Sequence, residues 1–186
     1  QPDGSIQVSR GTLEQCISRK SLLYDKKGEE HYNLISALHK SMRNSDPDAG
    51  VYWLCRMLEA GEDPLYVARR VVRFASEDVG LADPLAMLQA QAAVTALEFV
   101  GMPEARIPIA QAIIAVSLAE KSNSVCAAVD AAMADAEKGG YGAVPVHLRD
   151  THYAGHDRIS SGDGYKYPHD YPGHYVRQNY MPVELQ

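Results

Sequence analysis

SDPDAGVYWLCRMLEAGEDPLYVARRVVRFASEDVGLADP, residues 45–84, decides the fold, because this stretch repeats one helix-start signal three times. The three signals are Asp46-Pro47, Asp63-Pro64 and Asp83-Pro84. Each places a carboxylate that can cap a helix before a proline, whose missing N–H costs nothing at the first helical position. The sequence therefore predicts helices over about 47–60, 64–77 and 84–100. Gly61 and Gly101 follow two of them, as helix C-termini favour.

Helical patterns continue on both sides of this stretch. A helix is predicted over Val8–Leu23, and another over about Glu29–Met42 carries an apolar stripe. The stripe is formed by Leu34, Ile35, Leu38 and Met42. After Gly101, Pro103 and Pro108 open or kink a helix that ends near Glu120, and a last helix begins at Ser122 or Asn123 and stops before Gly139. No strand-like alternation precedes residue 140, so we expect an all-α bundle of about six to eight helices.

The segment after Gly140 has a different composition. It holds five of the seven histidines and seven of the eleven tyrosines, with Gly and Pro throughout. Gly and Pro interrupt any regular helix, whereas a disordered linker would lack so many aromatic residues. We expect an irregular tail, as a structured loop or a short hairpin, whose tyrosines pack on the bundle or on another subunit.

Charge is unevenly distributed along the chain. The net charge is −6, yet residues 10–43 carry +3 and residues 44–138 carry −7. Nucleic acid could therefore be bound only locally, and the candidates for contact are Arg19, Lys20, Lys26 and Lys27. Arg69, Arg70 and Arg73 form a second candidate phosphate-contacting patch. For both sets the alternative is a solvated face, which for the second set would be tied to Glu62, Glu77 and Asp78.

Catalytic and metal-binding patterns are weak in this sequence. No glycine-rich phosphate loop occurs, so we expect no nucleotide-binding or catalytic residues and no enzyme activity in this chain. His147, His152 and His156 suggest a helical metal-dependent hydrolase, but surface or packing histidines are the simpler interpretation. Cys16, Cys55 and Cys126 are too far apart for a zinc ribbon, and we expect buried free thiols. We therefore predict no metal site and no cofactor here.

The apolar helices between residues 84 and 136 predict self-assembly. They are rich in alanine and leave little polar surface for solvent. The candidate interface residues are Ile107, Ile113, Ile114, Leu118, Tyr165, Tyr167 and Tyr171. The alternative is that these helices form the monomer's own centre. The longest apolar stretch is too short to span a bilayer, so no membrane contact is expected, and the chain starts at Gln1 rather than Met, as expected for a fragment.

Four blocks of this sequence resemble the RarA/MgsA family of clamp-loader-like AAA+ ATPases. They are HYNLISALHKSMR at residues 31–43, continued by SDPDA at 45–49, then RFASEDVGLADP at 73–84, AEKSNS at 119–124 and YKYPHD at 165–170. The blocks are long, ordered and spread over most of the chain. The resemblance implies a C-terminal fragment whose ATPase motor, which would use ATP and Mg²⁺, is absent.

The resemblance also implies a division of the chain and a function. Residues 1–24 would be the end of the AAA+ lid, 25–140 a helical assembly domain, and 141–186 an aromatic tail packed on it. The expected function is oligomerisation, as a homotetramer, of a DNA-dependent ATPase in replication, recombination and repair at stalled forks. Expected partners are other copies of the chain, DNA through the full-length protein, and single-strand-binding protein, in a cytoplasmic, nucleoid-associated setting. A helical DNA-binding module using residues 10–43 is the alternative.

Overall fold

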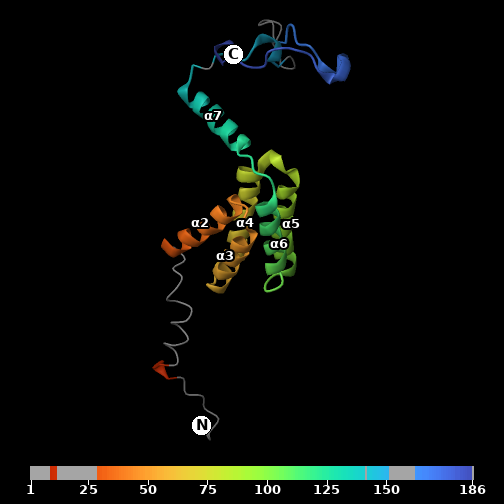
Figure 1. Ribbon diagram of the computed structural model, residues 1–186. Helices are drawn as coiled ribbons and strands as arrows, with labels where there is room; N and C mark the ends of the chain where they lie inside the picture. The colour runs from red at the N-terminus through yellow and green to blue at the C-terminus, as the bar shows by residue number, and fades with distance from the viewer. Residues whose placement is uncertain (1–8, 12–28, 141, 151–161, 186) are drawn as a thin grey trace. The chain divides into compact units, whose positions relative to one another are not determined.

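The computed structural model describes residues 9–11, 29–140, 142–150 and 162–185 (Figure 1). The chain divides into two compact units, Gln1–Ala128 and Val129–Gln186. The predicted helix Val8–Leu23 lies almost wholly outside the described residues. The candidate DNA contacts Arg19, Lys20, Lys26 and Lys27 lie outside them as well.

Three helices of the first unit begin as their sequence predicts. Helices α3 (Pro47–Glu59), α4 (Pro64–Phe74) and α5 (Pro84–Val100) each follow an aspartate in extended conformation. The carboxylates of Asp46, Asp63 and Asp83 accept backbone N–H bonds of 2.9–3.0 Å from the first turn of their helices. These bonds satisfy N–H groups that would otherwise lack a partner at each helix start.

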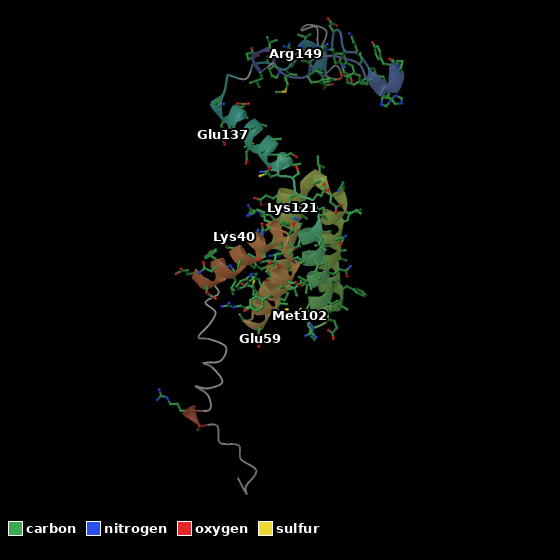
Figure 2. All side chains as sticks on the ribbon, viewed as in Figure 1. Lys40, Glu59, Met102, Lys121, Glu137 and Arg149 are labelled. Atoms are coloured by element: carbon green, nitrogen blue, oxygen red, sulfur yellow. The ribbon has the colours of Figure 1, made fainter. Side chains whose placement is uncertain are left out.

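The remaining helices of this unit are α2 (Glu29–Arg43) and α6 (Arg106–Leu118). Helices α5 and α6 lie side by side (Figure 1), and Met102 lies in the turn that joins them (Figure 2). The predicted helix 64–77 does not continue as one α-helix. It changes at Ala75 into a π-helical turn, Ala75–Val79, followed by a 3₁₀ turn, Gly80–Ala82.

The core of the first unit lies among α2–α6 and the π-helical turn. The predicted stripe on α2 is confirmed, because all four of its residues are buried. Leu38, Met57, Phe74 and Ile113 are among the fully buried side chains at its centre. Gly50 lets α3 approach α6 closely, since a Cβ there would stand 2.9 Å from the Cγ2 atom of Ile113. The all-α fold is confirmed by this packing.

The chain then enters α7 (Ser124–Lys138), which crosses the boundary between the two units. Beyond it, the described residues of the second unit form short 3₁₀ turns, such as Pro168–Asp170 and Pro172–His174, joined by extended backbone. None of these described residues forms a strand, so of the two expected forms, a structured loop or a short hairpin, they adopt the loop. Proline and glycine explain this, since they break any regular ladder of backbone hydrogen bonds.

Candidate functional site

The outward face of α5 carries a continuous apolar row. Its exposed members are Leu85, Leu88, Ala92, Thr95 and Phe99, in steps of three and four residues. Alternating three- and four-residue steps keep side chains on one stripe of a helix, as in the seam of a coiled coil. The buried residues Ala86, Ala90 and Ala93 face the other way. Helix α5 is thus apolar on both faces, with Phe99 91% exposed and Leu88 65% exposed.

Helix α6 repeats this arrangement. Ile107, Gln111, Ile114 and Leu118 follow one another in steps of four, three and four residues, and all are exposed. Ile109, Ile113 and Val116, on the opposite face, are fully buried. The inner face therefore packs the chain's own core and the outer face offers apolar side chains to solvent.

A shallow groove of about 230 Å³ joins the two rows. Ala92 and Ala96 of α5 line one side, and Pro108 and Gln111 of α6 line the other. Small residues let another helix approach closely, and larger apolar residues of each row stand beside them. We call this surface of α5 and α6 the outer face. Because apolar side chains gather on it, the outer face is the candidate interaction site of this chain.

Helix α7 is largely exposed in the part of the chain that the structure describes. None of its 15 residues is buried, and Val125, Val129 and Met133 form an exposed row at four-residue spacing. An isolated helix of this length is only marginally stable in water, so most helices of this size depend on packing. The exposed apolar row of α7 is therefore a second candidate contact surface.

The residues expected at an interface fall into three groups. Ile107, Ile114 and Leu118 belong to the outer face and are 64%, 40% and 66% exposed. Ile113 was wrongly grouped with them: it is fully buried in its own core, beneath Gly50. Tyr165, Tyr167 and Tyr171 are exposed in the second unit. The expectation that tyrosines pack on the bundle concerns the placement of the two units and stays a prediction.

Sequence reasoning missed the α5 half of the outer face. Leu85, Leu88 and Phe99 were not singled out, although their spacing repeats that of the α6 row. The available signal was a 17-residue helix that is apolar all round. Such a helix is either buried on every side or covered by a partner, and only a three-dimensional structure distinguishes the two.

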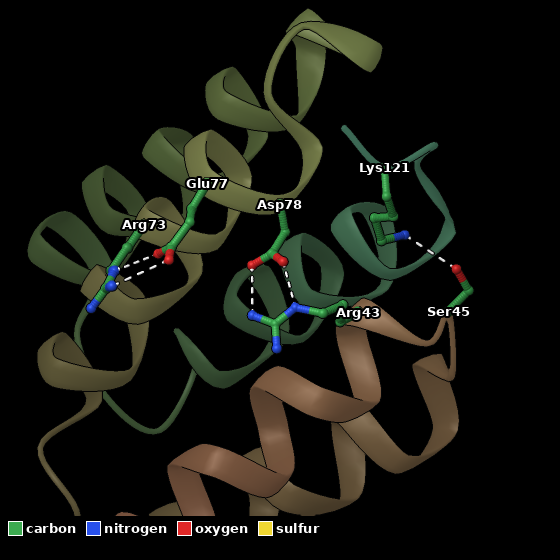
Figure 3. A network of polar contacts seen from close by, with 6 residues as sticks. All are labelled: Arg43, Ser45, Arg73, Glu77, Asp78 and Lys121. Carbon is green, nitrogen blue, oxygen red and sulfur yellow. Dashed lines mark hydrogen bonds and ion pairs between the residues drawn. The ribbon is translucent and has the colours of Figure 1, made fainter. Parts of the chain in front are cut away.

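The three arginines of α4 differ in surroundings. Arg73 is exposed and binds Glu77 through Nε at 2.6 Å, as the solvated-face interpretation predicts. Asp78 instead binds Arg43 of α2 with both carboxylate oxygens (Figure 3). Glu62 binds the ring of His31, with 2.6 Å between Oε2 and Nδ1. Arg69 is exposed and Arg70 is half-buried. The two acids expected to neutralise this patch are therefore engaged elsewhere.

The remaining functional features concern metal binding, the thiols and the membrane. Among the described residues, no group of three His, Cys, Asp or Glu side chains is placed to hold a metal ion. His152 and His156 lie outside those residues, and His147 bonds the backbone oxygen of Asn179 at 2.8 Å. Cys55 is exposed and Cys126 half-buried, and neither forms a disulfide, so the expectation of buried thiols is wrong for these two. Cys16 lies outside the described residues. No described helix is long and apolar enough to cross a membrane.

Comparisons with known proteins match the whole chain. A family model described as "MgsA AAA+ ATPase C terminal" matches residues 44–186, and one described as "AAA C-terminal domain" matches residues 1–43. The chain is 45% identical over 184 residues to "Replication-associated recombination protein A" of Bacillus subtilis, covering 99% of this chain and 44% of that protein.

Two further relatives extend this similarity. "Replication-associated recombination protein A" of Escherichia coli K12 is 46% identical over 174 residues, 93% of this chain and 39% of that protein. "ATPase WRNIP1" of Dictyostelium discoideum is 43% identical over 182 residues, 97% of this chain and 21% of that protein. The chain spans less than half the length of these curated relatives.

Proposed function

We propose that this chain, which belongs to the RarA/MgsA family of AAA+ ATPases and corresponds to their C-terminal domain, joins the subunits of a replication-associated ATPase. The observation that carries the proposal is the outer face of α5 and α6. Each helix packs the core with one face and exposes a second apolar row on the other. A monomer gains nothing from that second row, whereas burial of it against another copy would stabilise an assembly.

Helix α7 supports the same function from an independent position in the chain. Its exposed row of Val125, Val129 and Met133 would also be buried by an assembly. Closed symmetry is the usual result when identical chains use the same surface, and the family resemblance leads us to propose four subunits.

The parent protein would supply the chemistry. Relatives of this chain carry the name of replication-associated recombination proteins. We propose that the full-length protein is a DNA-dependent ATPase, with ATP and Mg²⁺ bound in a motor domain outside this sequence. No phosphate-cradling glycine loop occurs in these 186 residues, so the chain alone would not hydrolyse ATP. Action at stalled forks, contact with single-strand-binding protein and association with the nucleoid belong to the same proposal.

Charge placed on the outer face tests the function. Leu88→Glu combined with Leu118→Glu introduces one charge on each of α5 and α6, at side chains that are two-thirds exposed. The double variant should be monomeric at micromolar concentration, because a buried, unpaired carboxylate opposes assembly. Tyr52→Glu is the matched control, since Tyr52 is 56% exposed on α3 and away from the outer face. Assembly of the double variant equal to that of the control would refute the role of this face.

A further inference from the structure

A second groove, of about 480 Å³, lies between α3 and α6. Its lining is mainly apolar and includes Leu54 and Leu58 of α3, Ile107 and Ala110 of α6, and Met102 of the turn before α6. Ile107 is 64% exposed and Met102 42% exposed. We call this cavity the α3–α6 groove. Because Ile107 also belongs to the outer face, the groove and the outer face are continuous.

Two charged side chains stand on opposite walls of the groove. Glu59 is the last residue of α3 and Arg106 is the first residue of α6, and both are exposed. Glu59 and Met102 mark the end of the first unit at which the groove lies (Figure 2). Among the ion pairs of the residues that the structure describes, none involves Glu59 or Arg106. The groove therefore presents one negative and one positive charge beside an apolar floor.

Neither charge suits the helix that carries it. The aligned peptide dipoles of a helix place partial positive charge at its N-terminus and partial negative charge at its C-terminus. Glu59 puts a carboxylate at a C-terminal end, and Arg106 puts a guanidinium at an N-terminal end. The opposite charge would stabilise each helix better at these exposed positions. The fold thus gains nothing from either charge, which favours a role in contact with a partner.

The proposed tetramer requires more than one contact surface on each subunit. A two-fold contact through the outer face joins only two copies, so a closed assembly of four needs a second surface. In a two-fold contact, residue i of one copy meets residue j of the other, and j meets i. A groove that carries one acid and one base satisfies this condition with a second copy of itself.

We propose that the α3–α6 groove is the second contact surface, at which two copies of the chain meet about a two-fold axis. The inference rests on the proposed function, self-assembly through the outer face. Glu59 of each copy pairs with Arg106 of the other, and Met102 and Ile107 of each copy cover the other's apolar floor. A flexible methionine side chain is suited to filling such an irregular gap.

The groove makes the weaker of the two contacts. Among its lining residues, the large exposed hydrophobic side chains are Met102 and Ile107, whereas the outer face carries a row on each of two helices. The groove therefore joins pairs that have already formed through the outer face. Within a closed tetramer, each such contact is strengthened because the other contacts hold its partners close together.

Charge reversal tests the groove without disturbing the fold. Glu59→Arg and Arg106→Glu each place like charges opposite one another twice in the two-fold contact. Each should raise the dissociation constant between pairs about tenfold or more, so that dimers remain at concentrations where wild type forms tetramers. Glu120→Arg, which reverses an exposed acid beyond the other end of α6, is the control and should assemble as wild type does. Both groove reversals suit the helix dipoles, so urea denaturation should find these variants at least as stable as wild type.

Mixing the two variants tests the pairing itself. The Glu59→Arg groove carries two bases and the Arg106→Glu groove carries two acids. Mixed tetramers should therefore form, although neither variant forms tetramers alone. The chain with both reversals should also recover tetramers. Failure of both recoveries would overturn the pairing, and so would wild-type assembly of the two single variants.

Labelling of Cys55 distinguishes this contact from the one at the outer face. Cys55 is exposed and lines the groove, so a maleimide dye should lose access to it as tetramers form, in a chain whose other two cysteines are serine. Glu59→Arg should abolish this protection. Tetramers in which Cys55 stays fully reactive would overturn the groove contact and leave the outer face as the interface. A wild-type chain that stays monomeric at every concentration would refute the proposed function, and the groove contact with it.

Discussion

Leu88→Ala should weaken self-association strongly without weakening the fold. Full burial of a leucine side chain contributes about 1.5–3 kcal/mol, and 65% of Leu88 is still exposed in the isolated chain. Burial at an interface would thus add about 1–2 kcal/mol per side chain, or about 2–4 kcal/mol where a two-fold axis places the residue in the contact twice. The dissociation constant should rise by about 30-fold to several hundredfold.

The fold should tolerate this change. Leu88 is not part of the core, and alanine forms helices at least as well as leucine, so the monomer's free energy of unfolding should change by no more than about 0.5 kcal/mol. Sedimentation equilibrium of wild type and variant gives the two dissociation constants. Glu98→Ala, an exposed polar residue on the flank of α5, is the control. If Leu88→Ala and Glu98→Ala shift the dissociation constant equally, the outer face is not an interface.

Three other predictions concern the first unit. Gly50→Ala should lower the free energy of unfolding, measured by urea denaturation, by about 1–2 kcal/mol, because the added Cβ would stand 2.9 Å from the Cγ2 atom of the buried Ile113. Wild-type stability of this variant would contradict the close approach of α3 to α6. Asp83→Ala should cost about 1 kcal/mol by removing the cap of α5, and Asp83→Ser should restore most of it. Burial and the neighbouring arginines hold the pKa of His39 in the folded chain at about 4, below its unfolded value, so the free energy of unfolding should fall as the pH drops from about 6.5 to about 4. His39→Gln should flatten this pH dependence of stability. An unchanged dependence in the variant would contradict the buried environment of His39.

The sequence predicts those parts of the fold that interactions between neighbouring residues determine. The three Asp-Pro starts were predicted correctly because a cap and a proline act within one helical turn. The π-helical turn Ala75–Val79 was missed because it depends on distant residues. The backbone carbonyl oxygen of Asp78 accepts a 2.8 Å hydrogen bond from the backbone N–H of Ser122. A Cβ atom at Gly80 would stand only 2.9 Å from the backbone oxygen of Ser122. No local pattern specifies such a contact.

The candidate sites were predicted less completely, for related reasons. Neighbouring isoleucines 113 and 114 have opposite surroundings, one fully buried and the other 40% exposed. A helix that is apolar all round gives no amphipathic signal to separate them. On α4, the sequence indicates that Arg70 lies near other arginines. It cannot indicate that Asp78 pairs with Arg43, 35 residues away, rather than with the α4 patch.

Sedimentation velocity of the unmodified chain over a wide concentration range tests the central claim most directly. The chain has a mass of 20.4 kDa, so a monomer, a dimer and a tetramer are readily separated. If the outer face of α5 and α6 is buried against other copies of the chain, species heavier than the monomer should form at micromolar concentration, with the tetramer as the limiting form. A single species at the monomer mass throughout the range would contradict the claim that this chain is an assembly module.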